Sequence, residues 1–258
     1  DEELETHWTA ACDSPVLRRG PAIATTPATD TLVDENEALR FPAASEAGKA
    51  GGACIAHVFE AVSTMLKAAE DELGRIDALA GDGDHGQGMT RGATAAHEAA
   101  KKAVAAGAGT ASVLAAAGDA WADRAGGTSG AIWGLLLRAW SNALSDQAGP
   151  EGAAVVKGAR LALDGVTGLG GAKPGDKTLV DSFVPFVETL EIAFAAGKPL
   201  KQAWTEAAEA AGKAADETAK LTPKLGRARP LAERSIGHPD AGAISLAMVA
   251  KTVALQIS

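Results

Sequence analysis

The chain has 258 residues, of which 60 are alanine and 30 are glycine, and it contains no tyrosine. Alanine favours helices and is a poor strand former, so this composition predicts an all-α fold and argues against a β-sandwich or β-barrel. The apolar fraction of 47% excludes wholesale disorder. No apolar run reaches about 18 residues, so neither a transmembrane helix nor a membrane partner is expected.

The net charge of −9 is concentrated near the N-terminus, because residues 1–50 contain ten acidic and four basic residues. The nearly neutral remainder makes nucleic acid an unlikely partner class. The acidic start has no apolar stretch, so no signal peptide is expected. Cys12 and Cys54 lie in different segments without a metal-ligand spacing, which predicts a reducing, cytoplasmic setting and no zinc site.

In chain order, a short helical pattern at the start is followed by a Pro- and Ala-rich stretch that reads as a linker over residues 21–48. From about Gly51, apolar residues spaced by three and four predict an amphipathic helix that extends to Leu73. Glycine and proline punctuation predicts seven more helices, near residues 87–106, 110–125, 129–147, 151–168, 177–196, 199–220 and 241–257. Pro185 is expected to kink the sixth of the eight. Short loops between long helices predict antiparallel neighbours, hence a helical bundle or barrel.

The segment 77–88 is expected to stay non-helical, and it contains three carboxylates, Asp77, Asp82 and Asp84, separated by apolar residues and glycines. Glycine permits tight bends, in which the three carboxylates can converge. Converging carboxylates repel unless a cation lies between them, and hard oxygen ligands suit Mg²⁺ or Ca²⁺. A solvated acidic turn is the alternative interpretation.

Three similar motifs can be rejected. The spacing of Gly81, Gly83 and Gly86 matches a dinucleotide fingerprint, but no strand precedes it. The acidic residues could open an EF-hand, but its twelfth position would be Ala93 and not a glutamate. Gly170–Thr178, which overlaps the glycine-rich and non-helical segment 168–176, resembles a P-loop, but Asp176 intrudes before the lysine and the motif follows a predicted helix and not a strand.

Two further segments suit phosphate. Gly126-Gly127-Thr128-Ser129-Gly130 stands at a predicted helix start, where exposed backbone N–H groups bind anions. The alternative is an ordinary helix cap. The non-helical segment 221–240 and its flank are rich in lysine and arginine, which can clamp phosphates or remain a solvated loop. Together these features predict binding of a magnesium nucleotide and phosphoryl transfer or hydrolysis.

The order of these motifs is specific: the acidic turn with His85 and Gly86, then Gly126–Gly130, then Lys173–Thr178, then Glu233–Asp240. It resembles the nucleotide-binding L-domain of dihydroxyacetone kinases over about residues 51–258. Residues 4–20 are similar to the tail of that family's substrate-binding K-domain. The resemblance divides the chain into a K-domain remnant (1–20), a linker (21–48) and an L-domain (49–258) of a single-chain, ATP-dependent kinase.

The resemblance implies an eight-helix antiparallel barrel with a nucleotide site at one end. It implies two Mg²⁺ ions held by Asp77, Asp82 and Asp84, with ATP or ADP as the nucleotide. The phosphates would meet His85, Gly86, Gln87, Gly88, Thr128 and Ser129. The adenosine side would lie near Gly170, Leu179, Arg227, Asp240, Ala241 and Gly242. Gly88 departs from the Asn or Thr of many members, and Ala241 departs from their Pro.

The implied activity is phosphoryl transfer from ATP to a short ketose, dihydroxyacetone or erythrulose, that a separate K-domain holds. No catalytic nucleophile or base is identified in this chain, which we expect to be inactive toward the ketose on its own. The alternatives are an ADP-carrying, phosphotransferase-linked L-subunit, the nucleotide domain of a fatty-acid kinase, and a non-catalytic helical binding module. The sequence leaves the ketose and the oligomeric state open, a homodimer through the full-length protein being one candidate.

Overall fold

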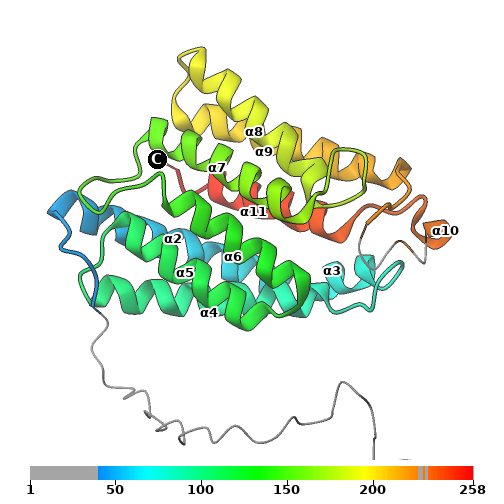
Figure 1. Cartoon of the computed structure of the whole chain (residues 1–258), viewed down its shortest axis with the longest axis horizontal. Helices are drawn as coiled ribbons and strands as arrows, with labels where there is room; N and C mark the ends of the chain where they lie inside the picture. Colours follow the sequence, from blue (N-terminus) through cyan, green and yellow to red (C-terminus); the bar gives the residue numbers. More distant parts are fainter. Residues whose placement is uncertain (1–39, 226–228, 230–231, 258) are drawn as a thin grey trace, which may run out of the picture. The chain divides into compact units, whose positions relative to one another are not determined.

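The structure, a computed structural model, describes residues 40–225, 229 and 232–257, and all regular secondary structure in this part is helical (Figure 1). Its eight helices of 14 or more residues are α2 (Glu46–Ala68), α4 (His85–Ala105), α5 (Thr110–Ala125), α6 (Gly127–Ser141), α7 (Gly152–Gly170), α8 (Leu179–Ala195), α9 (Leu200–Glu217) and α11 (Ala241–Ala254). Three shorter elements are α3 (Glu70–Asp77), the 3₁₀ helix η1 (Thr218–Lys220) and α10 (Ala232–Ser235). The prediction of an all-α fold with eight main helices is confirmed.

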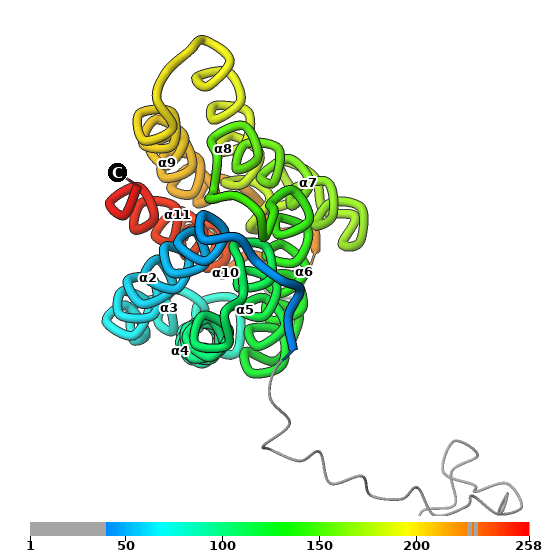
Figure 2. Tube along the Cα trace, turned by 90° about the vertical axis from the view of Figure 1, so that its left-hand side faces the viewer, coloured from blue at the N-terminus to red at the C-terminus, as the bar shows by residue number. Residues whose placement is uncertain are grey.

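The eight long helices form a closed ring (Figure 2). Each packs against the next one along the chain, and α11 packs against α2, which closes the ring. Neighbouring helices run antiparallel, so α4, α6, α8 and α11 all begin at the same end, on the right in Figure 1. The turn after α3 lies at that end too, and the expected antiparallel barrel is confirmed.

Alanine allows the helices to pack closely. Ala93, Ala96, Ala100 and Ala103 recur along one face of α4 and are fully buried. Small side chains at helical spacing let the helix axes approach, while large side chains fill the middle of the ring. There the indoles of Trp121 and Trp133 stack with their centroids 4.9 Å apart. Both indoles border an apolar cavity of about 300 Å³.

The first predicted helix is interrupted at Ala69, which separates α2 from α3. The interruption is local, because the N–H of Ala69 still donates to Met65 and its carbonyl still accepts from Leu73. α4 begins at His85, slightly before the predicted start. The segment 77–88 was expected to stay non-helical, and for residues 85–88, which include Gly86, this was wrong. Gly86 lies inside α4, and a Cβ there would come within 2.0 Å of the carbonyl oxygen of Glu70. Only glycine fits at position 86, because α3 packs directly against this part of α4.

Other boundaries shift by a few residues. α6 begins at Gly127 and ends at Ser141, and α7 continues to Gly170, so the predicted non-helical segment 168–176 begins later than expected. The segment 221–240 contains the single turn of α10. α8 runs through Pro185 as one helix.

The described unit begins before the predicted L-domain boundary. Ser45 caps α2 by accepting from the N–H of Gly48, and Phe41 packs against the core. Residues 40–48 of the predicted linker therefore belong to the folded unit. The predicted K-domain remnant, residues 1–20, lies outside the described residues. Within the described part, no helix combines the length and the apolar character that crossing a bilayer requires.

Candidate nucleotide and metal site

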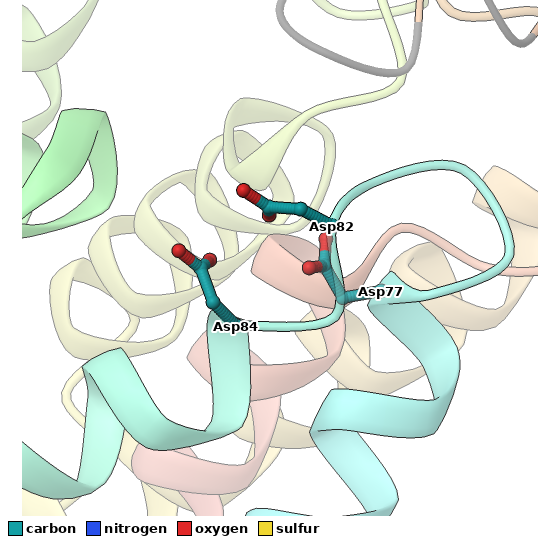
Figure 3. A group of neighbouring side chains, drawn as sticks. All are labelled: Asp77, Asp82 and Asp84. Atoms are coloured by element: carbon teal, nitrogen blue, oxygen red, sulfur yellow. The ribbon is translucent and has the colours of Figure 1, made fainter. Parts of the chain in front are cut away.

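The three predicted aspartates lie together at one end of the barrel. Asp77 is the last residue of α3, Asp84 immediately precedes α4, and Asp82 lies between them. One carboxylate oxygen of each lies within 4.8 Å of the others (Figure 3). We call residues 77–84 the acidic turn.

Glycines allow the acidic turn to bend back on Asp77. Gly83 adopts a φ of 79°, which an L-residue rarely adopts, and its N–H donates to Oδ2 of Asp77 over 2.8 Å. The N–H of Gly81 donates to the carbonyl oxygen of Asp77 over 2.6 Å. A Cβ at Gly81 would come within 2.4 Å of Oδ1 of Asp77. Both glycines are therefore required for the three carboxylates to converge.

The donor set fits a hard divalent cation. Asp77 is partly buried, whereas Asp82 and Asp84 are exposed. Three carboxylates at this spacing repel one another, and a bound cation relieves that repulsion. Mg²⁺ and Ca²⁺ prefer oxygen ligands of this kind.

Beside the acidic turn is a pocket of about 530 Å³, which we call the end pocket. It is lined by residues from the starts of α4, α6, α8 and α11. Eleven residues predicted for the site line it: Asp77, Asp82, Asp84, His85, Gly88, Thr128, Ser129, Leu179, Asp240, Ala241 and Gly242.

Two of the helix starts that line the end pocket, those of α4 and α6, lack side-chain caps. Neither Asp84 before α4 nor Gly126 before α6 forms a side-chain cap hydrogen bond. Gly126 and Gly127 have φ values of 72° and 60°, so the chain enters α6 through two left-handed residues. First-turn N–H groups without a capping side chain bind anions well.

The starts of α8 and α11, which also line the end pocket, do have side-chain caps. Thr178 and Asp181 form a capping box at the start of α8. At the start of α11, Asp240 accepts from the N–H of Ala243 over 2.7 Å. Burial, together with the charges of Asp181 and Asp77, raises the pKa of Asp240 to about 6, while Lys177 and the bond from Ala243 oppose the shift.

His85 connects two of these walls. Its Nε2 lies 2.9 Å from Oγ of Ser245 in α11, and the side chain is buried. Burial lowers the pKa of His85, against the charge of Asp77 and a hydrogen bond with the backbone of Ala241. A neutral imidazole in this position orients the start of α4 relative to α11.

Three predicted residues of the described part do not line the end pocket. Gly86 is buried against α3, Gln87 is exposed on α4, and Gly170 is exposed at the end of α7. Arg227 lies outside the described residues. The structure also brings in residues to which the sequence assigned no role, among them Arg91, Trp133 and Lys177. Of these, only Lys177 had a signal, since it directly precedes the Thr178–Asp181 capping pattern.

The structure is an all-α barrel. At one end of the barrel, an acidic turn that suits a cation lies beside a pocket lined by the starts of helices, and this combination defines a distinct class of domain. Residues 79–255 match the DAK2 domain, and the chain belongs to this family, the L-domain of dihydroxyacetone kinases. The family predicted from the motif order is confirmed.

Two of the most similar curated relatives are erythrulose kinases. The D-erythrulose kinase of Mycolicibacterium smegmatis is 49% identical over 98% of this chain and 45% of its own length. The L-erythrulose kinase of Pectobacterium atrosepticum is 50% identical over 98% of this chain and 43% of its own length. The chain thus spans less than half the length of these relatives.

Two other comparisons bear on the domain. The ADP-binding subunit DhaL of the PEP-dependent dihydroxyacetone kinase of Escherichia coli is 33% identical over 70% of this chain and 85% of its own length. The crystal structure of the dihydroxyacetone kinase of C. freundii in complex with AMP-PNP and Mg²⁺ superposes with a TM-score of 0.60 at 25% identity, over 93% of this chain and 38% of that one.

Proposed function

We propose that this chain is the Mg-ATP-binding part of a ketose kinase, which transfers the γ-phosphoryl group of ATP to a short ketose. The observation that carries the proposal is the convergence of Asp77, Asp82 and Asp84 within 4.8 Å, directly beside helix starts without side-chain caps. Carboxylates suited to Mg²⁺ and N–H groups suited to phosphate are the two parts that a magnesium nucleotide requires.

The relatives support the nucleotide and the reaction. The C. freundii dihydroxyacetone kinase was crystallised with AMP-PNP and Mg²⁺, and the bacterial relatives are erythrulose kinases. Dihydroxyacetone and erythrulose are therefore the candidate substrates. In this proposal a separate K-domain, normally on the same chain, holds the ketose. Residues 1–20, 21–48 and 49–258 remain assigned to K-domain remnant, linker and L-domain, with the last part of the linker, residues 40–48, folded onto the L-domain.

The proposed site residues fall into groups according to the part of the magnesium nucleotide that each group would bind. Asp77, Asp82 and Asp84 would hold two Mg²⁺ ions, which supply positive charge to the β- and γ-phosphates. The starts of α4 and α6, with His85–Gly88, Thr128 and Ser129, orient the phosphates. The adenosine side is assigned to Leu179 and Asp240–Gly242, with Gly170 and Arg227 as further candidates. This chain has to supply no nucleophile, because the ketose hydroxyl attacks.

The test separates binding from turnover. The purified chain is titrated calorimetrically with ATP in the presence of Mg²⁺, and ketose phosphate is assayed with and without an added K-domain. We expect binding that depends on Mg²⁺, slow hydrolysis at most, and no useful ketose phosphorylation without the K-domain, because positioning contributes about 7–11 kcal/mol in favourable cases. Absence of Mg-dependent nucleotide binding would refute the proposal, and robust phosphorylation by the chain alone would refute the division between the domains.

A second candidate function is that of an ADP-carrying relay subunit. The similarity to E. coli DhaL, an ADP-binding subunit covered over 85% of its length, favours it. A relay retains its nucleotide through purification and does not exchange it with free ATP, whereas a kinase domain exchanges it. Measuring bound nucleotide after gel filtration, and its exchange with labelled ATP, distinguishes the two.

A further inference from the structure

Lys177 is an unusual residue in the end pocket. Its side chain lines the pocket, yet only 4% of the residue is exposed. Its φ of 61° lies in the left-handed region, and it is the only non-glycine residue of the described part with a positive φ. Lysine gains nothing locally from this conformation, so interactions of its side chain must hold it there.

The ammonium group of Lys177 joins two distant points of the chain. Nζ donates to the carbonyl oxygen of Ser235 over 2.6 Å and to that of Leu221 over 3.1 Å. Leu221 follows η1, and Ser235 ends α10, which precedes the start of α11. One side chain therefore fixes both carbonyls against the start of α8.

The surroundings of the ammonium group are acidic. Burial lowers the pKa of Lys177, while the charge of Asp240 opposes the shift. The carboxylate of Asp181, in the first turn of α8, accepts from the N–H groups of Gly175 and Thr178 over 2.5 and 2.7 Å. Asp181 is thus occupied with the backbone before α8, which leaves the Lys177 ammonium to the two carbonyls and the charge of Asp240.

Two of the three donors of the Lys177 ammonium serve protein carbonyls, and the residue is only 4% exposed, so its main contacts are with the protein itself. They suit it to shape the pocket wall, since Ser235, His238 and Asp240 all line the end pocket. We propose that Lys177 is a positioning residue, which fixes the wall of the end pocket formed by Ser235–Asp240 and so sets the affinity for the nucleotide. This inference rests on the proposed function.

The test compares two lysines that lie near each other. Lys177→Met removes the donors and keeps the length of the side chain. Lys224→Met is the matched control, because Lys224 is exposed and pairs with Asp176 over 3.4 Å. We expect the Kd for Mg-ADP to rise at least tenfold in Lys177→Met and to stay within twofold in Lys224→Met. If Lys177 contributes only to stability, its variant melts at a lower temperature with an unchanged Kd, and the inference is overturned.

A second variant separates the effect of the left-handed backbone conformation at position 177 from the effect of the ammonium group. Lys177→Gly relieves the left-handed strain but also removes the donors, so we expect it to bind Mg-ADP as weakly as Lys177→Met. Recovery of wild-type affinity in Lys177→Gly would overturn the inference. This variant also decides the matter should Lys177→Met fail to fold.

Hydrogen exchange without nucleotide keeps the inference distinct from the proposed function. We expect amides of residues 221–225 and 232–240 to exchange faster in the Lys177 variants than in the Lys224 variant, with α4 and α5 unchanged. Equal exchange in all variants would show that Lys177 does not hold this wall. If the wild-type chain binds no Mg-ADP, the proposed function fails, while the exchange result still reports whether Lys177 fixes the segment.

Discussion

Nε2 of His85 lies 2.9 Å from Oγ of Ser245, and this contact joins residues 160 positions apart at the floor of the end pocket. The Ser245 hydroxyl donates to the carbonyl oxygen of Gly242 over 3.0 Å. Which of Nε2 and Oγ donates to the other depends on the tautomer of His85, whose imidazole also forms a hydrogen bond with the backbone of Ala241. The first residue of α4 is held against α11 in this way.

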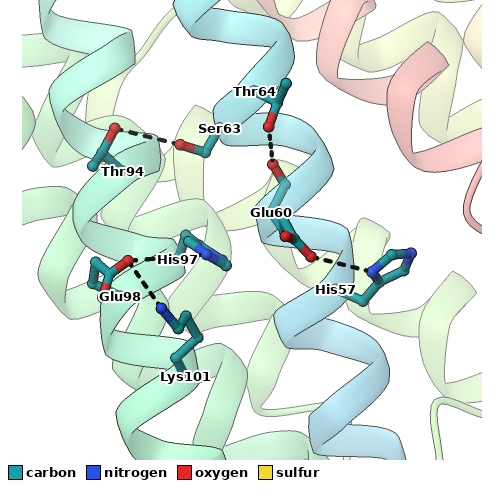
Figure 4. A network of polar contacts seen from close by, with 8 residues as sticks. All are labelled: His57, Glu60, Ser63, Thr64, Thr94, His97, Glu98 and Lys101. Carbon is teal, nitrogen blue, oxygen red and sulfur yellow. Dashed lines mark hydrogen bonds and ion pairs between the residues drawn. The ribbon is translucent and has the colours of Figure 1, made fainter.

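Ser245→Ala leaves the buried Nε2 of His85 without its hydrogen-bond partner. We expect a loss of about 1–3 kcal/mol in the free energy of unfolding, the cost of an unsatisfied buried polar group, measured by urea denaturation. The control is Ser63→Ala, whose hydroxyl contacts that of Thr94 on the exposed surface of α2 and α4 (Figure 4). Equal effects of the two substitutions would show that burial of the His85 contact adds nothing.

Gly86→Ala tests the close approach of α3 and α4. The added Cβ would meet the carbonyl oxygen of Glu70 at 2.0 Å, so the helices must separate. We expect destabilisation of about 1–3 kcal/mol and weaker binding of Mg-nucleotide, because Asp77 and Asp84 lie on either side of this contact. The control is Gly168→Ala in α7, where nothing lies near the new Cβ. It should stabilise the protein by about 0.5–1 kcal/mol.

Asp82→Asn keeps the size of the side chain and removes one charge from the acidic turn. We expect Mg-nucleotide binding to be lost in calorimetric titration, while the protein without metal unfolds at the same or a slightly higher temperature, because repulsion falls. Asp123→Asn is the control, since Asp123 is an exposed residue that pairs with its neighbour Arg124. Unchanged affinity in Asp82→Asn would remove Asp82 from the site.

Asp240 makes stability depend on pH. Its pKa is raised from 3.8 to about 6, so the folded protein binds this proton more tightly than the unfolded chain. The resulting stabilisation is complete below about pH 3.8 and is lost as the pH rises through about 6. Asp240→Asn keeps an oxygen for the N–H of Ala243 and carries no charge.

We therefore expect Asp240→Asn to be more stable than the wild type at pH 7 by roughly 1–3 kcal/mol, with the difference shrinking toward pH 4. Urea denaturation with a chelator and no nucleotide measures it. Asp216→Asn, on the exposed surface of α9, should change little at either pH. If the difference in the free energy of unfolding does not vary with pH, the pKa of Asp240 is not raised in the folded protein.

The parts of the fold that were predicted from the sequence depend on local patterns. Alanine and apolar residues at helical spacing, bounded by glycines, define α5 at Thr110–Ala125, as predicted. The acidic turn was predicted because its three carboxylates lie within eight residues of one another and are separated by glycines.

The remaining features depend on distant parts of the chain. The partners of Lys177 lie 44 and 58 residues away, and no local pattern points to them. The role of Gly86 was not predicted. Its close approach to Glu70 exists only because α3 packs on α4, and the sequence does not show that packing. Gly170 was assigned to the site through the resemblance, yet α7 continues through it and leaves it outside the lining of the end pocket.

Trp133 borders both the end pocket and the apolar cavity inside the ring. It stacks on Trp121 with only 16° between the ring planes, and the chain has no tyrosine. Two stacked indoles couple their electronic transitions, so this pair gives the protein an intrinsic ultraviolet chromophore. Because Trp133 lines both spaces, we expect the near-ultraviolet circular dichroism of this pair to change when a molecule binds against Trp133, which would make the pair a label-free optical reporter of occupancy.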